Sequence, residues 1–267
     1  MTDGRALALK YLEQQRVLGG DEVILSPNTP GFRPGSVFTA AAPEGQLTPG
    51  GSPGKIEPPA TDLPPSGISF DPPSGDLFAA DPVQQTHSLA EIAALVAPCT
   101  KCKLCEARTN TVPGEGPSDA RLVVVGEGPG RTEDETGRPF VGKAGELLTK
   151  ILEAIDFRRE RVFICNVVKC RPPENRLPQY DEIAACVPYL FRQIELIKPT
   201  VILAMGGTAA QTMLNTKQSL GALRNLVHRF RGIPVIVTYH PAALLRNPNW
   251  KRPTWDDVRI ARRILDS

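Results

Sequence analysis

The sequence predicts a three-layer α/β/α sandwich around a central four-stranded, mainly parallel sheet. Four short apolar runs, rich in β-branched residues, have the length and composition of buried strands. Helical patterns lie between them, and strands that alternate with helices pair in parallel through right-handed crossovers. The expected strands are 122–125, 162–168, 201–205 and 233–239, and the expected helices are 144–155, 180–197, 208–214 and 255–265.

The N-terminal third departs from this pattern. Residues 1–25 have apolar side chains near helical spacing, enough for a short amphipathic helix. Residues 26–85 are rich in Pro, Gly, Ser and Thr, and they break helix and strand alike. We therefore expect a disordered N-terminal extension before a folded domain over 86–267. Its first helix should begin at Ser88, an N-cap residue with Glu91 at the capping-box position.

Composition limits the class of protein. With 267 residues, of which 41% are hydrophobic, the chain can bury one substantial core. The net charge is only +2, so any nucleic-acid binding must use a local basic face. No apolar run approaches the roughly 18 residues of a membrane span, and the N-terminus is charged where a signal peptide is apolar. We expect a cytoplasmic monomer that does not associate with membranes.

Polar motifs follow three of the four expected strands. The first strand runs into GEGPG, the second ends at Asn166, and the fourth runs into YHP. Because functional sites in such sheets lie at the carboxyl ends of the strands, these motifs are expected to converge.

The first motif is GEGPGRTEDETGRPFVGKAGELL, residues 126–148. Its glycine spacing does not match a dinucleotide fingerprint. It supplies a flexible turn, a carboxylate at Glu127 and an acidic trio that begins at Glu133. Phe140 follows, either as a packing anchor or as a face for a planar ring, and its place at a strand-end cleft favours the second role.

Six cysteines without an export signal are expected to be thiols available for metal or cluster ligation. A C-x2-C pair and two later cysteines that flank a proline-rich loop can together hold zinc or a 4Fe-4S cluster, and spacing alone does not separate the two. Of the remaining two, Cys165 is expected in the core, and Cys105 is either a bystander or a competitor of Cys102. The four candidate ligands are Cys99, Cys102, Cys170 and Cys186.

The third motif, TYHPAALLRNP, contains His240 directly after a strand. His87 and His228 have no such position and are expected on the surface. The short helical AALLR segment would hold a leucine and an arginine at the mouth of the site. Leu245 then suits a wedge that enters a base stack, unless this leucine is core, and Arg246 suits a phosphate contact.

Together, the three motifs resemble the family 4 uracil-DNA glycosylases over about Cys99 to Asp266. That family combines GE-A/G-PG followed by ED and PFVG, CxxC with two later cysteines, and HPAA-x-LR. The resemblance implies an enzyme that flips uracil from single- or double-stranded DNA and hydrolyses its N-glycosidic bond, without lyase activity. It also implies that the four candidate cysteines hold a 4Fe-4S cluster.

The resemblance further implies a role for each site residue. Phe140 stacks on uracil, Asn166 reads its amide edge, and His240 stabilises the charge that develops at O2. Gly128 stands where the wider superfamily often has a catalytic aspartate. Glu127 and Glu133 are therefore the candidates for positioning water. The expected uracil-binding set is Glu127, Gly128, Phe140, Asn166 and His240, and the expected DNA contacts are Leu245, Arg246 and Arg171.

Two other interpretations remain open at this stage. A binding module of the same fold would recognise uracil-containing or single-stranded DNA without turnover. A zinc-containing nucleotide-binding protein would be colourless. The N-terminal extension could reach a repair or replication protein, or it could be dispensable.

Overall fold

The computed structural model of the chain describes residues 63–72 and 81–267. The predicted N-terminal helix and most of the predicted linker lie outside these residues. Within them, no helix is both long and apolar enough to cross a membrane.

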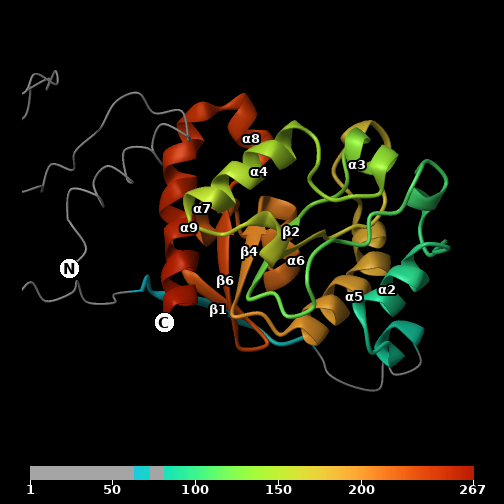
Figure 1. Ribbon diagram of the computed structural model, residues 1–267, viewed down its shortest axis with the longest axis horizontal. Helices are drawn as coiled ribbons and strands as arrows, with labels where there is room; N and C mark the ends of the chain where they lie inside the picture. Colours follow the sequence, from blue (N-terminus) through green and yellow to red (C-terminus); the bar gives the residue numbers. More distant parts are fainter. Residues whose placement is uncertain (1–62, 73–80) are drawn as a thin grey trace, which may run out of the picture. The chain divides into compact units, whose positions relative to one another are not determined.

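Six strands form one sheet in the described part of the chain. They are β1 (Ser66–Phe70), β2 (Leu122–Gly126), β3 (Val162–Asn166), β4 (Val201–Met205), β5 (Val227–Phe230) and β6 (Ile233–Thr238). Their order across the sheet is β1-β5-β6-β4-β2-β3 (Figure 1). The four predicted strands are β2, β3, β4 and β6, and they pair in parallel as predicted. β5 pairs antiparallel with β6 and parallel with β1, so these two strands run against the other four.

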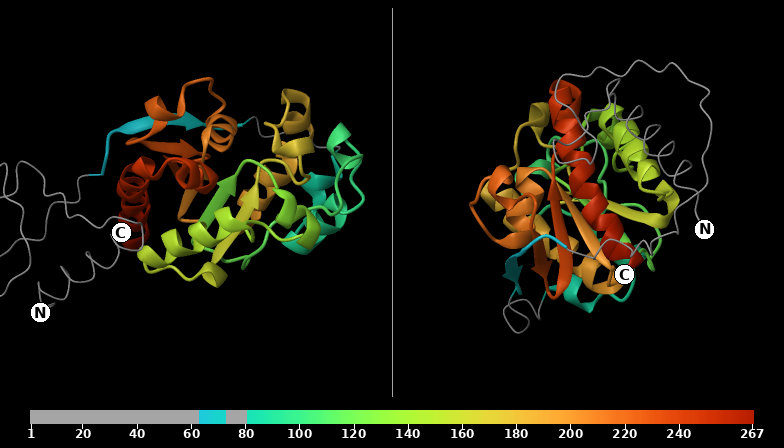
Figure 2. Two further views of the ribbon diagram at one scale, coloured as in Figure 1. Left: turned by 90° about the horizontal axis from the view of Figure 1, so that it is seen from above. Right: turned by 90° about the vertical axis from the view of Figure 1, so that its left-hand side faces the viewer.

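Strands β1 and β5 correct the prediction of a four-stranded sheet. β1 also lies inside 26–85, so the folded part begins before residue 86. Figure 2 shows β1, in cyan, beside the C-terminal strands. Both strands are short and poorly marked in the sequence. β1 reads SGISF and buries its side chains only partly at the sheet edge, and β5 reads VHRF, with two polar residues in four.

His228 joins these two strands, and its predicted surface position is wrong. The side chain is fully buried. Its Nδ1 accepts a hydrogen bond from the Ile68 backbone N–H at 2.9 Å, and its Nε2 lies 2.7 Å from the Leu223 carbonyl oxygen. A Cβ on Gly67 would lie 2.4 Å from His228 Nδ1, so the imidazole packs directly on the backbone of β1.

Helices cover both faces of the sheet, which confirms the three layers (Figures 1 and 2). They are α2 (Leu89–Val96), α3 (Arg131–Thr136), α4 (Lys143–Ala154), α5 (Tyr180–Ile197), α6 (Gly207–Leu214), α7 (Leu220–Leu223), α8 (Pro241–Arg246) and α9 (Lys251–Asp266). Side chains alternate along β2, as they do along any strand. Val123 and Val125 lie in the core with α2, α5 and α6, and Leu122 and Val124 lie in the core with α4, α8 and α9.

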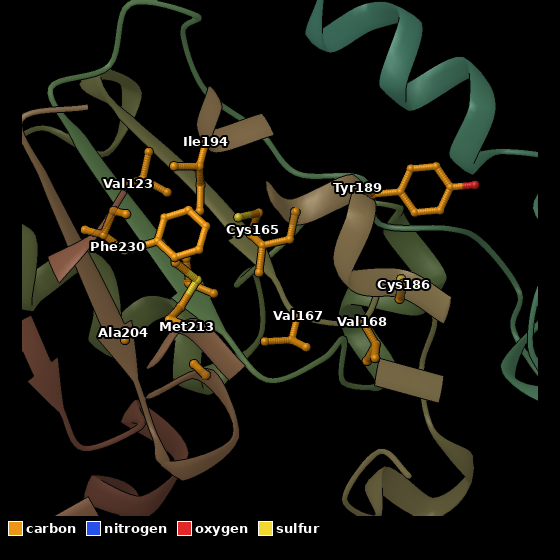
Figure 3. Packing of buried hydrophobic residues seen from close by; sticks show 14 of the residues in the cluster. Val123, Cys165, Val167, Val168, Cys186, Tyr189, Ile194, Ala204, Met213 and Phe230 are labelled. Atoms are coloured by element: carbon orange, nitrogen blue, oxygen red, sulfur yellow. The ribbon is translucent and has the colours of Figure 1, made fainter. Parts of the chain in front are cut away.

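Most predicted helices are close to the observed ones. α5 has the predicted bounds, whereas α9 begins four residues early, at Lys251. At α2 the Ser88 Oγ accepts from the Glu91 backbone N–H at 3.2 Å, which confirms the predicted cap. Figure 3 shows part of the core to which α5 and α6 contribute, with Phe230 and Met213 at one end and Cys186 and Tyr189 at the other.

Candidate active site at the strand ends

The predicted convergence of polar motifs is present in the structure. β6, β4, β2 and β3 are neighbours in that order and run in parallel, so their carboxyl ends share one edge. His240 follows β6, Gly206 follows β4, Glu127 follows β2, and Asn166 ends β3. This edge is where sites form in parallel α/β sheets.

Asn166, Gly126 and Phe140 lie close together at this edge. Asn166 is 1% exposed, and its buried Oδ1 has no hydrogen-bond partner. A Cβ on Gly126 would lie 2.4 Å from Asn166 Oδ1 and 2.5 Å from Phe140 Cζ. Only glycine fits at this point, and its absent side chain leaves an unused acceptor beside an aromatic ring.

The Phe140 backbone is held in an unusual conformation. Its φ of 50° is in the left-handed region, which costs a non-glycine residue roughly 1–2 kcal/mol. Arg159 donates from Nη1 to the Phe140 carbonyl at 2.9 Å and from Nη2 to the Pro139 carbonyl at 2.6 Å. A Cβ on Gly145 would lie only 1.8 Å from the Phe140 carbonyl oxygen. Sequence reasoning missed Arg159, because it lies outside every motif.

His240 faces the Phe140 ring, with the two ring centroids 5.5 Å apart. It is the N-cap of α8, and its Nδ1 accepts from the Ala242 backbone N–H at 3.2 Å. Burial, then the nearby charge of Arg246, lower the pKa of His240 to about 4, while Glu133 opposes the shift. The imidazole is therefore neutral at pH 7. Because Nδ1 is the acceptor, Nε2 carries the proton and can donate it.

Glu127 is oriented by a residue that the sequence did not single out. Its Oε2 accepts a hydrogen bond of 2.5 Å from the Thr208 hydroxyl at the start of α6. Gly128 follows, half-buried, and a Cβ there would lie 2.8 Å from Val168 Cγ2. An aspartate at position 128 would therefore require Val168 to move.

Glu133 holds the loop that follows Phe140 through hydrogen bonds to its backbone. It is a buried residue of α3, and its Oε1 accepts from the backbone N–H groups of Val141 and Gly142 at 2.9 and 2.8 Å. Gly142 is the N-cap of α4, so this carboxylate binds the positive end of a helix. One oxygen of Glu133 is thus already committed to the loop.

The predicted DNA contacts differ in their surroundings. Leu245 is 50% exposed while Leu244 is fully buried, so Leu245 is the leucine of this motif that is available to a partner. Arg246 is exposed beside it on α8. Arg171 is half-buried on the other side of the site, and its Nε donates to Asn175 Oδ1 at 2.9 Å.

The four candidate cysteines line one small pocket, together with Cys105. Arg108 Nη1 donates to Cys170 Sγ at 3.2 Å, and the Lys169 backbone N–H donates to Cys186 Sγ at 3.2 Å. Among the described residues, no three Cys, His, Asp or Glu side chains are placed to hold a single metal ion. Cys165 is fully buried in the core, as predicted.

A wider groove lies between α5, α6 and the end of β1. Thr208 lines it, so it adjoins the Glu127 side of the site. The cations in its lining are Lys217 and Arg231, and Arg231 pairs with Glu195. A phosphate backbone requires a more basic surface than this. The groove is therefore a poor candidate for the DNA-binding face.

Comparison with known proteins agrees with this architecture. The family model of the uracil DNA glycosylase superfamily matches residues 113–259, and the chain belongs to this superfamily. The chain is 50% identical to a type-4 uracil-DNA glycosylase of Thermotoga maritima over 171 residues, which are 62% of this chain and 89% of that protein. It is 45% identical to a type-4 enzyme of Sulfurisphaera tokodaii over 66% of this chain and 84% of that protein.

A type-5 uracil-DNA glycosylase of Pyrobaculum aerophilum is more distant, at 30% identity over 50% of this chain and 66% of that protein. Within the superfamily, the chain is thus a member of the type-4 uracil-DNA glycosylases, and the predicted resemblance is confirmed.

Proposed function

We propose that this chain hydrolyses the N-glycosidic bond of uracil in DNA and leaves an abasic site, the first step of base excision repair. The unpartnered, buried Oδ1 of Asn166 beside the Phe140 ring carries this proposal. The ring offers a stacking face to a flipped base, and the amide offers an acceptor to uracil N3–H and a donor to O4. Cytosine has an acceptor at N3, so it would leave the amide oxygen unpaired.

His240 and Glu127 have complementary roles in the proposed reaction. The base leaves as an anion, and the proton on His240 Nε2 is available to O2, where negative charge develops. Glu127 is the better candidate for positioning water or for balancing the sugar cation, because Thr208 orients its carboxylate. Glu133 has one oxygen engaged by the Phe140 loop, so its proposed role is to hold the stacking ring.

The cysteine pocket fits the 4Fe-4S cluster that the family resemblance implies. Its donor set consists of thiols, and N–H groups from Arg108 and Lys169 point at two of the sulfurs, as they do around anionic thiolate clusters. When bound, the cluster would supply covalent cross-linking of the segment before β2 to α5. We propose ligation by Cys99, Cys102, Cys170 and Cys186.

The remaining proposals concern substrate and context. We infer a monofunctional, monomeric enzyme that works in the cytoplasm on uracil in single- or double-stranded DNA, with Leu245, Arg246 and Arg171 as DNA contacts. The exposed positions of Leu245 and Arg246 beside His240 support this face. Residues 1–62 lie outside the described part of the chain. Their proposed role is to contact a repair or replication protein.

Alkaline cleavage of abasic sites tests the proposed function. The purified, brown protein is incubated with an oligonucleotide that contains one uracil, and alkali then cuts any abasic site. We expect cleavage at uracil and none in matched oligonucleotides with cytosine or thymine. No cleavage by protein with an intact cluster would leave the binding-module interpretation in its place.

Replacement of Cys170 by serine is expected to remove the cluster absorbance and lower the melting temperature, because a thiolate ligand between β3 and α5 is lost. Absorbance per protein and thermal unfolding measure both effects. Cys165→Ala is the matched control, since Cys165 is buried in the core and is expected to leave the colour intact. Cys105→Ser should also stay brown. A folded, brown Cys170→Ser protein would show that the ligand assignment is wrong.

The neutral state of His240 predicts a pH-dependent stability. Since its pKa falls from 6.5 to about 4 on folding, the unfolded chain binds more protons between these values. The contribution of neutral His240 to the free energy of unfolding is complete above pH 6.5 and is lost as the pH falls toward 4. Urea unfolding at pH 7 and pH 5 should show wild type losing up to about 2 kcal/mol relative to His240→Gln. Parallel loss in both proteins would mean that His240 titrates normally.

Replacement of Arg159 by methionine is expected to reduce kcat/KM on uracil-containing DNA by about 10- to 100-fold, because two charge-assisted hydrogen bonds to the Phe140 loop are lost. Burial lowers the pKa of the Arg159 guanidinium. Its two hydrogen bonds are to the carbonyls of Phe140 and Pro139, which set the position of the Phe140 ring. Arg161→Met is the control, since Arg161 is exposed in the same turn. Equal activity of the two variants would exclude this role.

A further inference from the structure

A fully buried lysine links the cysteine pocket to Asn166. Lys169 is 1% exposed. Its Nζ donates to the Asn166 carbonyl at 2.9 Å and to Gln193 Oε1 at 2.7 Å. Both acceptors are neutral, although a buried ammonium is stable only with good hydrogen bonds and nearby compensating charge. Its position in the sequence, one residue before Cys170, does not reveal this burial.

The backbone of the same lysine is bound on both sides. Its N–H donates to Cys186 Sγ at 3.2 Å, and its carbonyl accepts from the Val112 N–H at 2.8 Å. Gln193 Nε2 in turn donates to the Pro113 carbonyl at 2.7 Å. Lys169 therefore contacts a proposed cluster ligand with its main chain and the base-reading residue with its side chain.

Helix α5 provides two of the groups that bind Lys169, the Cys186 sulfur and the Gln193 amide. Cys186 and Gln193 are seven residues apart, which is two helical turns, so they lie on the same face of α5. Figure 3 shows Cys186 on this helix near Val167 and Val168, the residues between Asn166 and Lys169. A shift of α5 relative to β3 would thus move a proposed cluster ligand and the acceptor that holds the lysine together.

The surroundings of Nζ argue against a nucleophilic role. A lysine that forms a Schiff base must reach the sugar, and an ammonium with two hydrogen bonds at 1% exposure cannot do so without breaking the core. The thiols line the same pocket as Lys169 and become anionic as ligands, so they are the compensating charge within reach. The side chain is thus placed to transmit the position of the thiol set.

We propose that Lys169 is a positioning residue for base recognition: its ammonium fixes the Asn166 carbonyl, and so the Asn166 amide, relative to the cysteine pocket. Uracil recognition then depends on the integrity of the cysteine site although no cysteine touches the base. This inference rests on the proposed function, since it assigns to Asn166 the reading of uracil.

The test uses free uracil as a competitive inhibitor of the brown, full-length protein. For Lys169→Met we expect the inhibition constant of uracil to rise at least about 10-fold, because the hydrogen bonds that hold the Asn166 carbonyl in place are lost. Binding of uracil-free DNA should not change. Gln193→Met removes one acceptor and leaves the bond to Asn166, so it should give a smaller rise in the same direction.

Val167→Ala is the matched control for a damaged core. Val167 is fully buried on the same segment, but its side chain makes no hydrogen bond to Asn166. Cluster absorbance and melting temperature are measured for every variant, so that uracil inhibition is compared at equal cluster content. If Lys169→Met does not fold, Gln193→Met decides the question by the same measurement.

The outcomes separate the two proposals. If the wild-type protein releases no uracil, the proposed function itself is wrong. If the wild type is active and uracil inhibits Lys169→Met and Val167→Ala equally strongly at equal cluster content, the glycosylase function stands and Lys169 has no positioning role. If Lys169→Met does not fold and Gln193→Met has an unchanged inhibition constant for uracil, Lys169 likewise has no positioning role.

Discussion

Replacement of Asn166 by leucine is expected to reduce kcat/KM on uracil-containing DNA by at least about 10³-fold, because a site built around hydrogen bonds to its ligand depends on both partners. The fold should not suffer. The buried Oδ1 of Asn166 has no partner without substrate, and such an acceptor costs roughly 1–3 kcal/mol. Leucine has a similar size and no polar atom, so the free energy of unfolding should stay equal or rise.

Two measurements on Asn166→Leu check this opposition of activity and stability. Alkaline cleavage gives the rate of uracil release, and urea unfolding gives the free energy of unfolding at pH 7. Affinity for DNA without uracil is the control and should match wild type, because Asn166 is buried and does not lie on the surface. A variant destabilised by several kcal/mol would mean that the amide is needed for the fold and not for the base.

The central fold could be predicted because its strands are buried on both faces. β2, β3, β4 and β6 are continuous apolar runs, and helices long enough to show their period lie between them. β1 and β5 could not be predicted in the same way. They are short, and the contact that joins them, the Ile68 N–H to His228 Nδ1 hydrogen bond, has no period or spacing that marks it in the sequence.

The site residues that lie in motifs could be predicted, since each directly follows a strand. The residues that hold them could not. Thr208 binds Glu127 from 81 positions away, and Arg159 binds the Phe140 loop from a turn with no motif. Such contacts depend on which loops the sheet order brings together. One sequence contains no period or spacing that marks them.

The glycine at position 128 has a physical explanation in the packing of the neighbouring loop. Val168, which follows β3, occupies the space that a side chain at 128 would need. An aspartate at position 128 would therefore require the Val168 side chain to move. Glu127, one residue earlier and bonded to Thr208, is the carboxylate that the structure leaves free of this conflict.

Replacement of Gly126 by alanine is expected to abolish uracil release, with a fall of at least about 10³-fold in kcat/KM. The new methyl group would lie 2.4 Å from Asn166 Oδ1 and 2.5 Å from Phe140 Cζ, well inside contact distance, so it would push the amide and the ring away from the positions in which they are proposed to bind uracil. Alanine at Gly207 is the matched control. That glycine also follows a strand at this edge, and a Cβ there meets nothing within 4 Å.

Rates for Gly126→Ala and Gly207→Ala are compared at equal cluster absorbance, together with their urea unfolding. Overpacking in a rigid region costs about 1–3 kcal/mol, so some loss of stability is expected for Gly126→Ala alone. The decisive quantity is uracil release by the fraction that remains folded. If folded Gly126→Ala protein works as fast as Gly207→Ala, uracil recognition does not depend on the positions of Asn166 and Phe140, and it must be sought elsewhere on this edge.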